Sequence, residues 1–201
     1  MFIEKITNYI PKNEQEVADK RTILKFIKNN PDVLHRSNEI AHMTSSAIVV
    51  NESMTKILFA FHNIYKSWSW VGGHNDGDAD CLAVAIREAK EETGVTNIRP
   101  YNEDIFMIDT LYVPCHYKKG IFVSDHLHLN VTYLLIADEN DPLFIKIDEN
   151  SGVKWFDIDD VLNHVSEPRM HIVYQKAIDR IKIIRYKKNT QMGILTDDIS
   201  L

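Results

Sequence analysis

Three glutamates in one short segment have the types and spacing that could do chemistry: Glu88, Glu91 and Glu92. In an α-helix, positions i, i+3 and i+4 share a face, so the three carboxylates would lie within about 100° of one another. Like charges at this spacing repel, and a helix gains no stability from them. Dense carboxylate oxygens are the ligands that Mg²⁺ and Mn²⁺ prefer. The segment therefore predicts a divalent-cation site.

A helix over residues 80–93 must position these carboxylates. Asp80 is suited to be its N-cap, and Gly94 is suited to the position just after its last turn. A second stripe, on a different side of the helix, is expected to pack on a sheet: Leu82, Ile86, Ala89 and Thr93. The helix is thus expected to be anchored on one side and to present the glutamates on another.

Two neighbouring features favour a cation site over a solvated acidic face, which is the alternative interpretation. Gly72 and Gly73 precede the helix, and glycine lets the backbone approach the carboxylates closely. Arg87 lies four residues before Glu91, so we expect the two to pair. Such a pair would hold that carboxylate in one rotamer.

The composition restricts the kinds of partner. The 201 residues are 44% hydrophobic and 26% charged, which is typical of a globular protein. A net charge of −6 argues against binding of long nucleic acid through its phosphates. No apolar run is long enough for a transmembrane helix, so we expect no membrane partner. The first residues lack the features of a signal peptide, and Cys81 and Cys115 suggest no disulfide framework, so we expect a cytoplasmic protein.

We expect an α/β fold, with a core domain over residues 41–185, an N-terminal helical extension over 1–40 and a loosely held tail over 186–201. Strands before, between and after helices predict a mixed sheet with helices on both faces. The expected elements are a helix over 12–30 with Val17, Leu24 and Ile27 on one stripe, a hairpin over 44–63 that turns at 51–53, a loop over 67–78, strands over 104–113, 126–137 and 152–156, and helices over 157–165 and 168–184.

The glycines and glutamates together resemble a known motif. Gly73, followed by Arg87-Glu88-Ala89-Lys90-Glu91-Glu92-Thr93-Gly94-Val95, is similar to the Nudix box, G-x5-E-x7-R-E-U-x-E-E-x-G-U, in which U is aliphatic. The distances match over 23 positions without a gap. The resemblance implies a Nudix-type α/β/α sandwich with a mixed sheet. It also implies an Mg²⁺- or Mn²⁺-dependent hydrolase that cleaves a diphosphate bond in a nucleoside diphosphate linked to another moiety.

The resemblance implies roles for single residues. Glu88 and Glu92 would bind the cation, and Glu91 would share the ligand set, steered by Arg87. The carbonyl oxygen of Gly72 would be a further ligand.

Members of the family often take a last carboxylate from a loop beyond the box. Glu149 is the preferred residue for it here, and Asp125 is the alternative. Arg87, Glu88, Glu91 and Glu149 then form the expected catalytic set. The general base is left open among Glu88, Glu91 and the loop carboxylate.

The chain departs from the motif at one position. Ala79 stands where the box has its first glutamate, and alanine cannot bind a cation. Asp78 and Asp80 flank it and Asp76 is close, so a neighbouring carboxylate is expected to replace the missing one.

A strand rich in histidine is expected to line a pocket. Alternation over residues 126–137 puts His126 and His128 on one face with Asn130 and Thr132. A polar face in a sheet covered on both sides suggests contact with a nucleotide or phosphate. We therefore expect His126, His128 and His74 to bind substrate. A zinc site is the alternative, for which the sequence offers no evident third ligand.

Two other functions compete with the hydrolase. The Nudix scaffold also supports an isoprenoid-diphosphate isomerase, which would need a reactive cysteine near the substrate, and Cys81 lies inside the box helix instead. A catalytically silent nucleotide-binding module is suggested by Ala79 alone. The expected partner is a small nucleoside-diphosphate compound, whose second moiety the sequence does not identify. We also expect a homodimer formed through the N-terminal helix.

Overall fold

The computed structural model describes residues 2–118 and 120–197 of the chain. Its main sheet has eight strands in the described part, and its centre is a long parallel pair in register over ten residues. The strands are β1 (Ala41–Val50), β2 (Lys56–His62), β3 (Ser67–Ser69), β4 (Val71–His74), β5 (Ile98–Pro100), β6 (Met107–Val113), β9 (His126–Ala137) and β10 (Asn150–Asp157). β7 (His116–Lys118) and β8 (Ile121–Val123) form a separate hairpin.

Strand β1 is buried at all ten of its positions, as a central strand covered on both faces must be. It runs parallel to β9 and antiparallel to both β2 and β4. The mixed sheet predicted from the sequence is therefore confirmed. Gly72 and Gly73 of β4 pair with Ser46 and Ser45 of β1. The glycine pair therefore lies next to the middle of β1.

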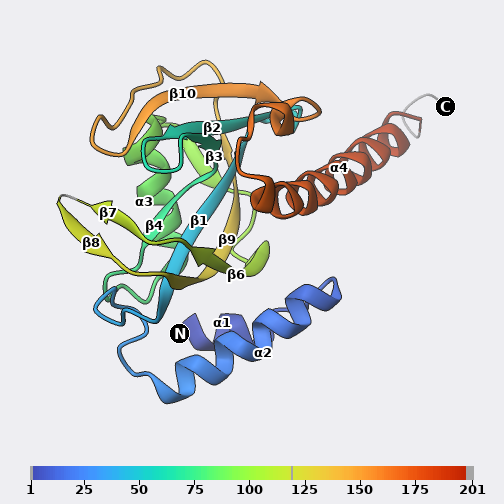
Figure 1. Cartoon of the computed structure of the whole chain (residues 1–201). Helices are drawn as coiled ribbons and strands as arrows, with labels where there is room; N and C mark the ends of the chain where they lie inside the picture. The colour runs from blue at the N-terminus through green and yellow to red at the C-terminus, as the bar shows by residue number, and fades with distance from the viewer. Residues whose placement is uncertain (1, 119, 198–201) are drawn as a thin grey trace.

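Helices cover both faces of the sheet (Figure 1). One core contains the side chains of α1 (Phe2–Asn8), α2 (Glu14–Asn29) and α3 (Cys81–Thr93) that pack on Ala47 and Val49 of β1. The other contains α4 (Pro168–Asp197) and the 3₁₀ turn η1 (Val161–His164), which pack on Ile48 and Val50. Alternate residues of one strand thus serve two cores. No helix in the described residues combines the length and apolarity that a membrane span requires.

Several local predictions were wrong. The expected loop over 67–78 contains β3 and β4, because these residues pair with β2 and β1. The expected helix over 157–165 is a single 3₁₀ turn. Of the predicted stripe of this helix, Ile27 is buried and Leu24 packs against the core, but Val17 is 56% exposed, and Glu16 and Ile23 are buried in addition.

The two ends of the chain also differ from expectation. α1 was not predicted, and α4 continues to Asp197, through most of the expected tail. Residues 198–201 of that tail lie outside the described residues. The predicted hairpin over 44–63 is confirmed by the antiparallel pairing of β1 and β2.

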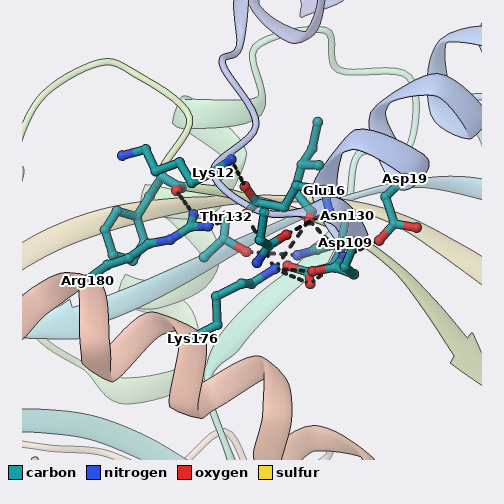
Figure 2. Close-up of polar contacts among 12 residues, drawn as sticks. Lys12, Glu16, Asp19, Asp109, Asn130, Thr132, Lys176 and Arg180 are labelled. Atoms are coloured by element: carbon teal, nitrogen blue, oxygen red, sulfur yellow. Dashed lines mark hydrogen bonds and ion pairs between the residues drawn. The ribbon is translucent and has the colours of Figure 1, made fainter.

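A buried charge network joins the N-terminal extension to α4. Glu16 is fully buried, and its Oε1 lies 2.7 Å from Arg180 Nη2 and 3.4 Å from Lys176 Nζ. Figure 2 shows both cations reaching from α4 toward Glu16 of α2, and Lys176 Nζ also lies 2.6 Å from Oδ1 of Asp109 on β6. The hydroxyl of Tyr9 donates to Glu16 Oε2 at 2.8 Å. Three elements far apart in the sequence, α2, β6 and α4, therefore meet in one charge network.

We predict that Glu16→Ala lowers the free energy of unfolding by about 3–5 kcal/mol, because it leaves Arg180 and Lys176 buried with too little negative charge. Denaturant unfolding followed by circular dichroism measures this loss. The matched control is Glu14→Ala, which removes an exposed glutamate from the same helix and should change stability by about 0.5 kcal/mol or less. Equal stabilities for the two variants would contradict the role of the network.

Candidate functional site

The helix that carries the glutamates has the ends that the sequence predicts. The side chain of Asp80 accepts a hydrogen bond from the backbone N–H of Ala83 at 3.1 Å, as an N-cap does. Gly94 adopts a left-handed conformation with φ of 79° and donates to the carbonyl oxygen of Lys90 at 2.9 Å. Ala85 and Ala89 of the helix are fully buried in the core beneath the sheet. α3 is therefore rigidly placed against β1 and β4.

Three carboxylates converge at the open side of α3. Glu88, Glu92 and Glu149 each offer an oxygen, and the three oxygens lie within 4.8 Å of one another. Glu149 comes from the loop before β10, where its backbone carbonyl accepts from the N–H of Asn63. The fold thus brings a residue far along the chain to the two box glutamates.

Both glycines of β4 are needed for this approach. The N–H of Gly72 donates to Glu92 Oε1 at 2.8 Å. A Cβ atom at Gly73 would lie 2.5 Å from Glu88 Cδ, and one at Gly72 would lie 2.6 Å from the Cα of Ser46. Any side chain at either position would therefore displace the carboxylate or the strand.

Burial and mutual repulsion disfavour the ionised form of these carboxylates when no cation is bound. Glu92 is 4% exposed, and burial raises its pKa to about 8, opposed by the hydrogen bond from Gly72. Burial also raises the pKa of Glu88, with Lys146 lowering it and Glu91 raising it. The site therefore favours the binding of further positive charge.

Glu91 and Arg87 have other partners than the sequence predicts. Glu91 is half exposed and pairs with Lys146 Nζ at 3.0 Å, so its carboxylate is drawn away from the group of three. Arg87 lies 3.8 Å from Glu88 Oε1 and 3.4 Å from Asp78 Oδ2. The expected pair between Arg87 and Glu91 is therefore wrong, and Arg87 faces Glu88 instead.

Lys146 is a member of the site that the sequence did not single out. Its Nζ lies 3.1 Å from Glu149 Oε2 as well as 3.0 Å from Glu91 Oε2. Burial lowers the pKa of Lys146, but its hydrogen bonds to these two carboxylates outweigh that effect and raise it above the ordinary value. Its position three residues before Glu149 was the available signal.

The aspartates around Ala79 all have partners outside the carboxylate group. Asp76 pairs with Arg36, Asp78 Oδ1 accepts from the N–H of Asp80, and Asp80 caps α3. None of them belongs to the carboxylate group beside Gly73 in the described residues. The replacement for the missing glutamate thus stays a prediction that this arrangement does not favour.

The predicted substrate-binding histidines do come together, and a fourth joins them. The rings of His74, His126 and His128 each lie 5.0–5.1 Å from the ring of His42 on β1. His42 was not predicted. Its register position opposite His128 follows from the parallel pairing of β1 with β9, which the sequence does not specify.

The same sheet face continues as a polar network below the histidines. Asn130 Oδ1 accepts from the hydroxyls of Thr44 and Ser46 at 2.9 Å each, and its Nδ2 donates to Thr132 at 2.9 Å. All four residues are buried, so the predicted polar face of β9 is present. Asp125, the alternative loop carboxylate, is bound instead to the Tyr112 hydroxyl and is not in the carboxylate group.

The donor set fits a divalent cation such as Mg²⁺ or Mn²⁺. Carboxylate oxygens within 4.8 Å of one another are hard ligands, and among the described residues the side chain of the buried Glu92 accepts a hydrogen bond from Gly72 only. Glu88, Glu92 and Glu149 are the residues that would hold such an ion.

A profile of the NUDIX domain matches residues 41–180 of the chain. The chain belongs to the Nudix family. The expected membership of the Nudix family is thereby confirmed. The matched region begins at β1 and ends within α4, so it contains the carboxylate group and the histidines.

Solved structures of Nudix proteins resemble the chain in fold. A Nudix hydrolase from Clostridium perfringens is 24% identical with a TM-score of 0.49, over 70% of this chain and 97% of its own. A binary complex of a C. elegans Ap4A hydrolase is 19% identical with a TM-score of 0.50, also over 70% of this chain and 97% of its own. A comparison with curated proteins finds no match.

We predict opposite effects of Glu92→Gln with and without a cation. The folded pKa of about 8 exceeds the ordinary 4.5, so the stability that Glu92 gives is complete below pH 4.5 and is lost as the pH rises through 8. In EDTA at pH 8 the variant should be more stable than the wild type by up to about 4 kcal/mol. Mg²⁺ should then stabilise the wild type and leave the variant unchanged. Thermal unfolding measures both, and equal responses to Mg²⁺ would contradict the assignment.

Proposed function

We propose that this Nudix domain hydrolyses a diphosphate bond in a nucleoside diphosphate linked to another moiety, with Mg²⁺ or Mn²⁺ as cofactor. The observation that supports it is the convergence of Glu88, Glu92 and Glu149 beside the glycine pair of β4. A diphosphate repels an attacking nucleophile with its own negative charge. A bound divalent cation would neutralise that charge, orient the bridge and acidify the attacking water.

The residues of the site would then bind the cation and accept the proton of the attacking water. Glu92 is fixed by the N–H of Gly72 and is only 4% exposed, which leaves little room for a water molecule beside it, so we assign it to cation binding. Glu149 is 38% exposed and pairs with Lys146, so it can reach both the cation and a water molecule. We assign the general base to Glu149, with Glu88 as the second candidate. Arg87 would hold Glu88 in place.

Lys146 would have two successive partners. In the structure it balances Glu91 and Glu149. A cation and a phosphate group entering the site would supply new charges of both signs, and the ammonium group could then bind a phosphate oxygen. Glu91 would act through Lys146 rather than as a principal cation ligand.

The isomerase alternative is not favoured by the position of the cysteine. Cys81 is 4% exposed, burial raises the pKa of its thiol, and Asn75 Nδ2 lies 3.4 Å from its Sγ. A buried neutral thiol in the first turn of α3 is a poor catalyst. The alternative of a catalytically silent module is supported by Ala79 alone. The convergence of Glu88, Glu92 and Glu149 argues against it.

Other features of the proposal rest on the sequence and the fold together. We place the hydrolase domain over residues 41–185, between an extension over 1–40 and a tail over 186–201. Two free cysteines agree with a cytoplasmic location. The expected partner is a small nucleotide derivative, and the homodimer stays a prediction.

We predict that Glu88→Gln lowers kcat/KM by about 10²–10⁴-fold, because it removes a charge from the cation group. Phosphate or nucleotide release with Mg²⁺ is measured over a panel of ADP-ribose, dinucleoside polyphosphates, nucleotide sugars and oxidised nucleoside triphosphates. The matched control is Glu91→Gln on the same helix, which should lose about tenfold or less. Wild-type rates for Glu88→Gln, or a larger loss for Glu91→Gln, would contradict the assignment.

A further inference from the structure

Four histidines from three strands meet at one end of the sheet, next to the glycine pair. His42 lies on β1, His74 ends β4, and His126 and His128 begin β9. The Cα atoms of His42 and His128 are partners in the parallel ladder, and His74 is opposite Thr44, two residues beyond His42. Side chains at these positions point to the same face of the sheet. The fold therefore holds the cluster on rigid elements.

The nitrogen atoms of three of these rings lie close enough to share one ion. His42, His74 and His128 each offer a ring nitrogen, and the three nitrogens lie within 4.8 Å of one another. The fourth ring extends the cluster, because the Nε2 atoms of His126 and His128 are 3.3 Å apart. Two imidazole nitrogens on a tetrahedral zinc ion, with Zn–N bonds of about 2.0–2.1 Å, are separated by about 3.3 Å.

The hydrogen bonds of the outer nitrogens prepare the inner ones as ligands. Nδ1 of His42 lies 2.9 Å from the carbonyl oxygen of Asn38, and Nδ1 of His126 lies 2.8 Å from that of Ser124. A carbonyl only accepts, so each Nδ1 carries a proton, and the Nε2 of each ring is bare whenever the ring carries a single proton. Histidine ligands of zinc typically donate their other N–H to a backbone carbonyl in this way.

One of these bare nitrogens is buried with nothing to bind. His42 is 4% exposed, and its Nε2 has no hydrogen-bond partner in the structure. Buried polar atoms are rarely left unsatisfied. Ordinary packing of the four rings does not explain why His42 Nε2 lacks a hydrogen-bond partner inside the histidine cluster.

A phosphate group fits this cluster less well than a metal ion. A phosphate needs N–H donors or positive charge, whereas His42 and His126 present lone pairs. Burial lowers the pKa values of His42, His74 and His128, so the rings are neutral. Arg36 is close, but its charge is balanced by Asp76.

We infer that His42, His74 and His128 bind one zinc ion, with His126 at the fourth coordination position. This site is distinct from the carboxylate group, because its ligands are nitrogens on the β1–β9 face rather than glutamates on α3 and the loop before β10. The zinc ion would tie together β1, β4 and β9, and would fix His74 directly after Gly73. Its function would be to hold the glycine pair in the position that Glu88 and Glu92 require.

The test uses the full chain and reads metal content rather than activity. Protein stripped with dipicolinate is dialysed against zinc in excess Mg²⁺, so that Mg²⁺ occupies the carboxylate group, and bound zinc is measured by elemental mass spectrometry. We expect one zinc ion per chain, an X-ray absorption spectrum with imidazole scattering, and tetrahedral visible bands when cobalt replaces zinc. Less than a stoichiometric amount of bound zinc, or a spectrum with oxygen ligands alone, would overturn the inference.

Variants locate the zinc ion. His42→Gln and His128→Gln should each reduce zinc affinity by about 10- to 100-fold or more, as the loss of a ligand does. The matched control is His164→Gln, which changes an exposed histidine on η1 and should keep full zinc content. Glu88→Gln should also keep it, which separates this site from the hydrolytic one. The inference would be overturned if both histidine variants retained zinc or if Glu88→Gln lost it. If the variants do not fold, the X-ray absorption spectrum of the wild type decides between histidine and oxygen ligands.

Discussion

The hydrogen bond from the N–H of Gly72 to the buried carboxylate of Glu92 is the interaction on which the site depends. It fixes α3 against β4 at the one place where the helix carries acidic groups. A carboxylate that is 4% exposed is costly as an anion unless other charges compensate. Glu88 and Glu149 add negative charge rather than removing it. A bound polyvalent cation would compensate this negative charge, and we propose that this is what links the fold to hydrolysis of a diphosphate.

The rest of the fold holds the two sides of that interaction in place. β1 lies at the centre, and its residues are fully buried because α3 packs on one of its faces and α4 on the other. The N-terminal extension is an integral part of this structure, since Glu16 neutralises two cations of α4. In Figure 1, α1 and α2 lie beside β6, and Figure 2 shows that the connection is made of charged side chains. The Nudix domain is thus extended by a buried ionic contact rather than by a separate domain.

Local sequence signals predicted α3 and its glutamates. The features that the sequence did not predict, β4 and the partners of His42 and Lys146, depend on contacts between distant segments. Asp80 and Gly94 mark the ends of α3 because caps depend on neighbouring residues only. β4 was mistaken for a loop because its two glycines have no strand preference, and it is a strand only through its pairing with β1. His42 and Lys146 were missed for a related reason. Each has a partner more than 30 positions away in the sequence, His74 for His42 and Glu91 for Lys146.

The most direct test of the cation site is the anomalous scattering of manganese in crystals of the wild-type chain soaked with Mn²⁺. The account predicts an anomalous peak within about 2.2 Å of carboxylate oxygens of Glu88, Glu92 and Glu149. Such a peak would show that the three groups share one ion next to Gly72. A map without a peak there, at full Mn²⁺ occupancy elsewhere or with a nucleotide bound, would contradict the central claim.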